Sequence, residues 1–288
     1  MNVSIRCAVT EDIPACGRIA HEAFKDINER HGFENIEFPT VESGCKAAEF
    51  HIRNPSSFSV VADVGGRVVG SCFLDAHSSI RGVALVSVDP TVQSQGVGRK
   101  LMEAVLEQCR GSRGVRLVQH TFNTSSVALY ASLGFEVKEP LLILRGRPSG
   151  QGPSDVEVRA MCSQDLDACA ALCEKVHGFE RTNELRDCLQ SFTPFVALRA
   201  GRIVAYASAP NAWFANHGVA EAEDDMSALL LGIHLAIAGP LCFLLPIRQA
   251  SLFRWCLEHG LRVVMPMTLM AMGEYREPAG CHFPSVVF

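Results

Sequence analysis

Apolar and polar positions follow one pattern twice along the chain. Residues 58–70 and 195–205 alternate in character and turn at a Gly-Arg pair, which is typical of a β-hairpin. Before each hairpin, residues 5–16 and 158–169 carry Arg, Asp and Cys in step at an offset of 153. Both segments predict a short strand followed by a capped amphipathic helix. The pattern therefore predicts one α+β unit that is used twice.

The later parts of the two copies match at a different offset. Gly134 and Gly260 each end a helical pattern before an apolar strand, which predicts helix C-caps 126 residues apart. Residues 147–154 are rich in Pro, Gly and Ser, as linkers are. We predict domains at 1–147 and 156–288 with a linker over 148–155, each domain a mixed, mostly antiparallel sheet flanked by helices. One large sheet with incidental similarity between its halves is the alternative.

Residues 226–247 form the one stretch long enough to span a membrane, with 22 residues and no formal charge. Gly239 and Pro240 interrupt it, and three acidic residues directly precede it. Because Gly-Pro stops a helix, we expect a buried helix of about three turns and then a buried strand at 241–245. The sequence predicts no membrane association.

Composition narrows the class of protein. Hydrophobic residues make up 48% of the 288, enough for packed cores, which excludes a disordered chain. Lys and Arg number 26 against 31 Asp and Glu, and the net charge of −5 argues against a dedicated nucleic-acid binder. The 12 cysteines form no C-x-x-C pair and no apolar leader opens the chain. We therefore expect free thiols and a cytoplasmic protein.

Cys169, Cys173 and His177 recur at helical spacing and raise the question of a metal site. They supply only three ligands, and no second cluster accompanies them. A buried helical face explains them better, so we predict no metal.

The residues that suggest chemistry lie in the first copy. Residues 84–88 are a continuous apolar run that predicts a buried strand, and it stops at Asp89-Pro90. A glycine-containing turn and an amphipathic helix follow, an arrangement that favours an anion because unpaired helical N–H groups point at it. The third glycine of a dinucleotide fingerprint is replaced by Leu101, and the phosphate loop of NTPases is absent.

The turn, Gln93-x-x-Gly96-x-Gly98 after a Val-x-Pro strand end, resembles the pyrophosphate loop of the GNAT superfamily of acyl-CoA N-acyltransferases. Three further features stand in the order that the superfamily shows: a strand at 115–119, Asn123-x-x-Ser126 at a helix start, and Tyr130 before Gly134-Phe135. The resemblance covers about residues 3–145.

The resemblance implies a role for each matched position. The main chain of a strand would pair with the pantetheine arm of acetyl-CoA, with the Val88 amide polarising the thioester carbonyl. Tyr130 would protonate the leaving thiolate as general acid, and its alternative is a packing aromatic on a helix. The implied acetyl-CoA contacts are Val86, Ser87, Val88, Gln93, Ser94, Gln95, Gly96, Val97, Gly98, Arg99, Asn123 and Ser126. Ser126 has helix capping as its other interpretation.

The general base stays open. Many members of the superfamily carry a carboxylate on the strand before the loop, but residues 84–88 contain none. Asp75, His77 and His120 stand at strand ends and are possible bases, with a surface or hydrogen-bonded residue as the alternative interpretation of each, and a chain of water molecules is another route.

The second copy lacks these residues. At the offset of 126, Asp224 stands where Gly98 does, Cys256 replaces Tyr130, and residues 221–225 hold four carboxylates that would repel a pyrophosphate. We predict a degenerate copy that covers a sheet edge, shapes the acceptor pocket or offers a dimer surface. We expect the apolar segment within residues 273–288 to dock on the rest of the protein, with the first copy as its candidate surface.

The resulting prediction is an N-acetyltransferase that moves an acetyl group from acetyl-CoA to a primary amine by direct attack. A non-catalytic acyl-CoA-binding or interaction protein is the alternative. Residues 25–50 fall where the superfamily places its acceptor-binding segment, and their acidic residues favour a cationic amine. A small molecule, a peptide N-terminus and a lysine all remain open as acceptors, and so does a homodimer.

Overall fold

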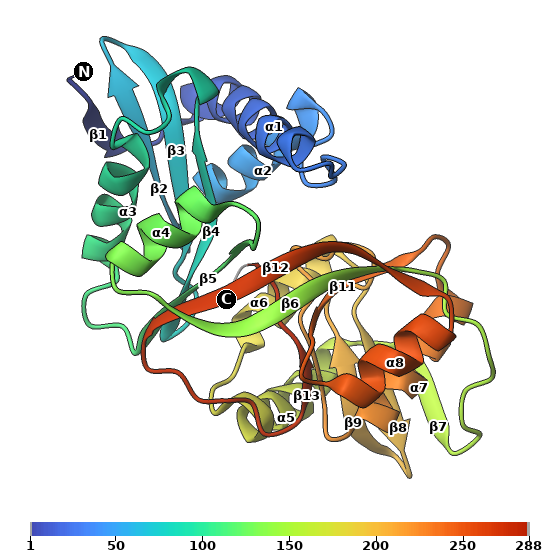
Figure 1. Cartoon of the computed structure of the whole chain (residues 1–288). Helices are drawn as coiled ribbons and strands as arrows, with labels where there is room; N and C mark the ends of the chain where they lie inside the picture. The colour runs from blue at the N-terminus through green and yellow to red at the C-terminus, as the bar shows by residue number, and fades with distance from the viewer. Residues whose placement is uncertain (1, 287–288) are drawn as a thin grey trace.

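The computed structural model describes residues 2–286, in which two halves follow the same order of elements (Figure 1). The first half consists of β1 (Ser4–Cys7), α1 (Ile13–Arg30), α2 (Val41–Arg53), β2 (Ser57–Val64), β3 (Arg67–Asp75), β4 (Ile80–Val88), α3 (Val97–Gln108), β5 (Gly114–His120), α4 (Thr124–Ser132) and β6 (Glu136–Gly146). The second consists of β7 (Val156–Ala160), α5 (Leu166–His177), α6 (Thr182–Ser191), β8 (Phe195–Arg199), β9 (Arg202–Ala207), β10 (Gly218–Ala220), α7 (Glu223–Ala236), β11 (Leu241–Pro246), α8 (Ala250–Glu258) and β12 (Leu261–Gly273). One short strand, β13 (Cys281–Phe283), follows.

The start of each half is held by the same ion pair. Arg6 Nη1 lies 2.7 Å from Asp12 Oδ2, and Arg159 Nη1 lies 2.7 Å from Asp165 Oδ2. Each carboxylate also accepts a backbone N–H three residues earlier at 2.9 Å, which satisfies a donor at the helix start. The offset of 153 is therefore a structural repeat.

The later elements repeat at the offset of 126. The helix N-caps Gly96 and Ala222 correspond, and so do Asn123 and Gln249. The predicted hairpins and the predicted helix and strand of residues 226–247 are confirmed as β2–β3, β8–β9, α7 and β11. In the described part of the chain, no helix is long and apolar enough to cross a membrane.

Two sheets form the framework. One has eight strands in the order β1-β2-β3-β4-β5-β12-β6-β11, and the other has five in the order β13-β10-β9-β8-β7. All neighbours pair antiparallel except β4 and β5. Helices α1 and α2 cover one face of the first-half strands and α3 and α4 the other (Figure 1).

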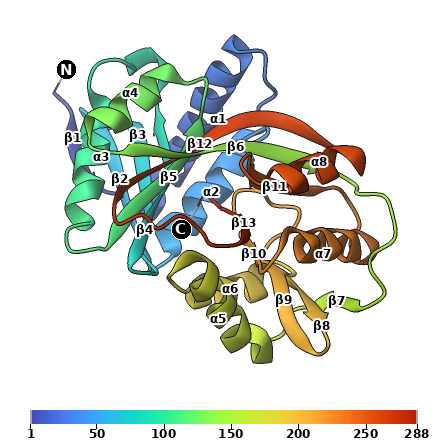
Figure 2. The same cartoon turned by 60° about the horizontal axis from the view of Figure 1, so that its bottom comes forward.

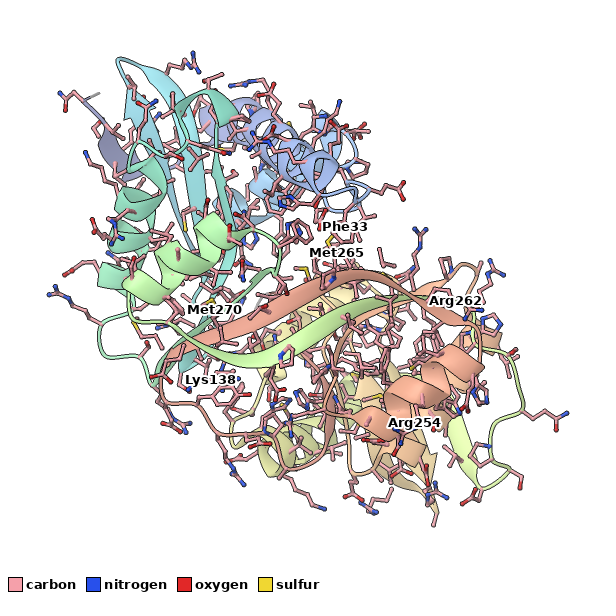
Figure 3. The ribbon with its side chains drawn as sticks, viewed as in Figure 1. Phe33, Lys138, Arg254, Arg262, Met265 and Met270 are labelled. Atoms are coloured by element: carbon pink, nitrogen blue, oxygen red, sulfur yellow. The ribbon has the colours of Figure 1, made fainter. Side chains whose placement is uncertain are left out.

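The last strands of the two halves are exchanged. β12 inserts between β5 and β6, and β6 pairs with β11, so the long β6 and β12 ribbons run side by side from one half into the other (Figures 1 and 2). Met270 of β12 belongs to the core under α3, whereas Met265 of the same strand packs with Phe33 between the halves (Figure 3). The boundaries at 147 and 155 stay a prediction, and the core cluster around Met265 contains side chains from both halves.

The end of the chain docks on the second half. β13 pairs with β10, and the Phe283 ring stacks on Phe243 at 4.3 Å between centroids. The end of the chain therefore docks, as expected. It pairs with β10 and not with a strand of the first copy, because β9 occupies one edge of β10 and leaves the other edge for β13.

Candidate active site

A gap opens in the first-half sheet where β4 and β5 part. These strands pair only over residues 80–83 and 114–117, and a register shift between β3 and β4 places a bulge at Ala84. Beyond it, residues 84–88 have β3 on one side, and no strand within residues 2–286 pairs with their other side.

The hydrogen-bond phase of β4 shows which groups face this gap. The Asp89 amide donates to the Val69 carbonyl at 2.9 Å, and antiparallel pairs alternate between bonded and non-bonded positions. Val86 and Val88 therefore turn their N–H and C=O groups away from β3 and into the gap. Gln93 Nε2 already donates to the Val88 carbonyl at 3.1 Å. The gap thus presents a strand edge that an extended ligand can pair with.

The gap continues into a cavity of about 870 Å³. Of the residues that the sequence assigned to acetyl-CoA, Gln95 does not line this cavity, and the others do. They are Val86, Ser87, Val88, Gln93, Ser94, Gly96, Val97, Gly98, Arg99, Asn123 and Ser126, and Tyr130 lines it too. Residues more than 40 positions apart thus meet at one site.

The start of α3 closes one end of the cavity. Gly96 is the N-cap with a φ of +82°, a left-handed conformation that favours glycine, and no side chain caps the helix. The first N–H groups of α3 therefore point outward with the positive end of the helix dipole, a suitable place for a phosphate. Arg99 adds positive charge there, with Nη2 2.5 Å from Ser132 Oγ.

Tyr130 reaches the cavity from α4. Its side chain is 7% exposed, and it packs in the core under α3 with an edge-on contact to Phe135. Burial raises the pKa of Tyr130, and a hydrogen bond with the Ser126 side chain opposes that shift. The hydroxyl therefore carries its proton at neutral pH, as a proton donor must. The helix cap is Asn123 rather than Ser126, because Asn123 Oδ1 accepts the Ser126 N–H at 3.2 Å.

The two histidines among the candidate bases each lie beside carboxylates. His77 Nδ1 lies 2.8 Å from Asp75 Oδ1, and His77 Nε2 lies 3.0 Å from Asp187 Oδ2 of the second half. The hydrogen bond to Asp75 raises the pKa of His77, whose ring lies between the two acids. His120 Nε2 lies 2.7 Å from Glu37 Oε1, with both side chains buried.

The second half forms the far wall of the same cavity. The lining residues from this half are Arg181, Glu184, Asp187, Cys188, Ser191, Phe192, Trp213, Phe214, Ala215, His217, Met267 and Val286. Sequence analysis missed them as individual site residues, because none carries a local motif. Only the general expectation that the second copy shapes a pocket pointed to them.

Comparison with known proteins identifies the fold family. Residues 55–137 match the model of an acetyltransferase (GNAT) domain. Over 89 residues the chain is 33% identical to the N-alpha-acetyltransferase RimI of Mycobacterium tuberculosis, a match that spans 30% of this chain and 56% of that relative. The chain therefore covers only about half of that relative's length.

Two solved structures resemble the whole chain. One, provisionally described as an acetyltransferase, is from Pyrococcus horikoshii, with a TM-score of 0.74, 16% identity and coverage of 99% of this chain and 94% of that one. The other is a tandem GNAT protein from the clavulanic acid biosynthesis pathway, with a TM-score of 0.60, 11% identity and coverage of 94% and 98%. Residues 55–137 thus match a GNAT domain, and the whole chain shares the fold of these two structures.

The second half has the same gap, filled by its own chain. The Glu221 amide donates to the Val204 carbonyl at 3.1 Å, as the Asp89 amide does to Val69, so residues 218–220 correspond to 86–88. β13 pairs with these residues, Gly218 opposite Phe283. A segment of the protein therefore occupies the strand position that stands open in the first unit.

The helix start that follows this strand also differs between the two halves. The loop between the strand and the helix N-cap is six residues shorter than in the first unit. Glu223 Oε2 accepts the Leu252 N–H at 2.7 Å, and Asp225 pairs with Arg199 at 2.9 Å. Within residues 2–286, no cluster of three or more metal-ligating side chains is present, and the stripe of Cys169, Cys173 and His177 is a buried helix face.

Proposed function

We propose that this GNAT protein transfers an acetyl group from acetyl-CoA to a primary amine, and that the first half does so. The observation that carries the proposal is the continuous path from the open edge of β4 to the N-terminus of α3, with Tyr130 in the same cavity. The 12 free cysteines suit a reducing compartment, so we assign the protein to the cytoplasm.

The direction of β4 orients the ligand. Because α3 follows the C-terminal end of β4, a pyrophosphate at α3 makes the pantetheine arm run along β4 from Val88 toward Val86. The thioester then lies at the Val86 end. The sequence assigned the carbonyl contact to the Val88 amide, and the strand direction favours the amide of Val86 instead.

The proposed reaction needs two proton transfers. The amine nitrogen bonds to the carbonyl carbon, the C–S bond breaks, and the thiolate takes the proton of the Tyr130 hydroxyl. The amine gives its own proton to a base, for which the buried His120–Glu37 pair is our candidate. Because burial raises the pKa of Tyr130, ionisation of this tyrosine should not depress the rate below about pH 10.

We place the acceptor between the two halves, with residues 156–288 as a unit that does not bind acetyl-CoA. The far wall of the cavity combines aromatic side chains such as Trp213 and Phe214 with the Asp187 carboxylate. A cavity of this size suits a small molecule better than a folded partner. A small amine with an apolar body is therefore the acceptor class we propose.

Replacing Tyr130 by Phe tests the enzyme assignment. The variant should lose about 10²–10⁴-fold in turnover, since it removes a general acid, and keep its affinity for acetyl-CoA in calorimetry. Tyr275→Phe is the matched control, because Tyr275 does not line the cavity. Unchanged turnover in Tyr130→Phe would show that the Tyr130 hydroxyl is not the general acid and that the ring only packs in the core. If the natural protein turned over none of a broad panel of amines, the non-catalytic acyl-CoA-binding protein would be the remaining interpretation.

A further inference from the structure

Gln119 is buried with its amide unpaired. Its side chain is 7% exposed, and neither Nε2 nor Oε1 has a hydrogen-bond partner within residues 2–286. A buried polar group without a partner destabilises the folded state. Such groups are rare in folded proteins and call for an explanation. Gln119 also lines the cavity, so a ligand could supply both partners.

The neighbours of Gln119 on the sheet do not use its amide. Thr268 lies directly opposite on β12, but its hydroxyl lies 2.8 Å from that of Thr121. On the other side of β5 the gap begins, because the last pair with β4 joins Leu117 to Val83. The amide is therefore left at the edge of the gap.

The strand register places Gln119 along the path of the proposed ligand. Continuing the parallel register beyond Leu117 and Val83, with the bulge at Ala84 counted as an extra residue on β4, brings Gln119 beside Leu85 and Val86. Side chains two apart on a strand share a face, so Gln119 lies on the face of Leu117. Leu117 belongs to the core cluster that includes Tyr130. Gln119 thus stands at the acyl end of the gap, on the side of the proposed acid.

We propose that Gln119 binds the reacting groups: Nε2 donates to the thioester carbonyl oxygen, and Oε1 accepts an N–H of the incoming amine. This inference rests on the proposed acetyl transfer. The carbonyl oxygen gains negative charge when the amine nitrogen bonds to the carbon, and it loses that charge when the C–S bond breaks and the sulfur takes the Tyr130 proton. A donor fixed at this oxygen stabilises the charge as it forms.

Gln119→Leu removes both polar atoms at nearly constant size. We expect kcat/KM to fall by about 10²-fold or more, as for loss of one oxyanion donor. The melting temperature should stay the same or rise, because an unpaired buried amide is replaced by an apolar group. A purely structural role predicts the opposite, a lower melting temperature. Gln108→Leu on the exposed face of α3 is the matched control and should change neither quantity.

Gln119→Glu separates the donor from the acceptor. Its ionised carboxylate can accept from the amine but has no hydrogen to donate, whereas its protonated form still donates an O–H. We therefore expect kcat/KM to fall to the level of Gln119→Leu as the pH rises and this carboxyl ionises. Full activity of the Glu variant at every pH would overturn the carbonyl contact.

The inference and the proposed function can fail separately. Turnover that depends on Tyr130 but is unchanged in Gln119→Leu would overturn the role of Gln119 and leave the acetyl transfer standing. A fall in both turnover and melting temperature in Gln119→Leu would show that Gln119 has a structural role. No turnover by the natural protein would overturn both.

Discussion

The two gaps of the molecule share one backbone plan and differ in what fills them. In the first half, Val86 and Val88 turn main-chain groups that no described strand pairs with toward a cavity, and a glycine N-cap opens the next helix. In the second half, β13 pairs with residues 218–220, and three acidic residues occupy the first turn of the next helix. The second half thus has a paired strand edge and a shorter loop before its helix. An open edge in one half and a covered edge in the other indicate where a ligand belongs.

Gly98→Asp should make the first gap like the second, where Asp224 stands at the corresponding position. The carboxylate would repel the pyrophosphate, so we expect acetyl-CoA binding in calorimetry to fall from one per chain to none. The fold should survive, because an acid in the first turn suits the helix dipole.

Asp224→Gly is the reciprocal control for this substitution and should leave one binding site, since β13 still fills the second gap. Full binding by Gly98→Asp would show that the first half was wrongly chosen.

Phe283→Ala tests whether β13 is part of the core. The ring is fully buried against Phe243, so its loss should cost about 3–5 kcal/mol in the free energy of unfolding, measured with denaturant. Leu235→Ala, at a site 79% exposed, should change stability by less than about 0.5 kcal/mol. A second bound acetyl-CoA in Phe283→Ala would mean that β13 alone closes a competent site.

Phe214→Ser tests whether the acceptor reaches the second half. Phe214 is 51% exposed and lines the cavity, so the change should spare the fold. We expect KM for the amine to rise about tenfold, equivalent to about 1.4 kcal/mol, with KM for acetyl-CoA unchanged. Leu235→Ser is the control. An unaltered amine KM would confine the acceptor to the first half.

Removing the repeated Arg–Asp ion pair should have the smallest effect among these substitutions, the controls aside. Arginine hydrogen bonds lower the pKa of both Asp12 and Asp165. A carboxylate whose folded pKa is depressed adds stability that is present above its unfolded pKa of about 3.9 and is lost as the pH falls through the folded value. Asp12→Asn and Asp165→Asn should each cost about 1 kcal/mol at pH 7 and flatten the loss of stability in acid.

The two variants should differ slightly, which sharpens the comparison of the halves. Asp165 also accepts from Cys162 Sγ at 3.2 Å, whereas Val9 holds the corresponding position in the first half. We therefore expect the larger loss for Asp165→Asn in thermal unfolding measured across pH. Equal or reversed losses would show that the thiol contributes nothing.

Much of the site could be predicted because its signals are local. Gln93, Gly96 and Gly98 lie within one turn, and Asn123 and Tyr130 lie on one helix, so spacing alone relates them. Asp187 could not be assigned in this way, because its partner His77 lies more than 100 positions earlier in the chain. The unpaired amide of Gln119 was also out of reach, since it depends on where two strands part.

The sequence by itself determined that one unit occurs twice and that only the first copy keeps a glycine loop followed by Tyr130. These features depend on hydrophobic period, turn residues and short spacings, which act between neighbours along the chain. Only the tertiary structure decided that the last strands are exchanged, that β13 fills the second gap and that both halves wall one cavity. Those outcomes depend on which distant strand edges and apolar faces satisfy one another, and many pairings are compatible with the same local pattern.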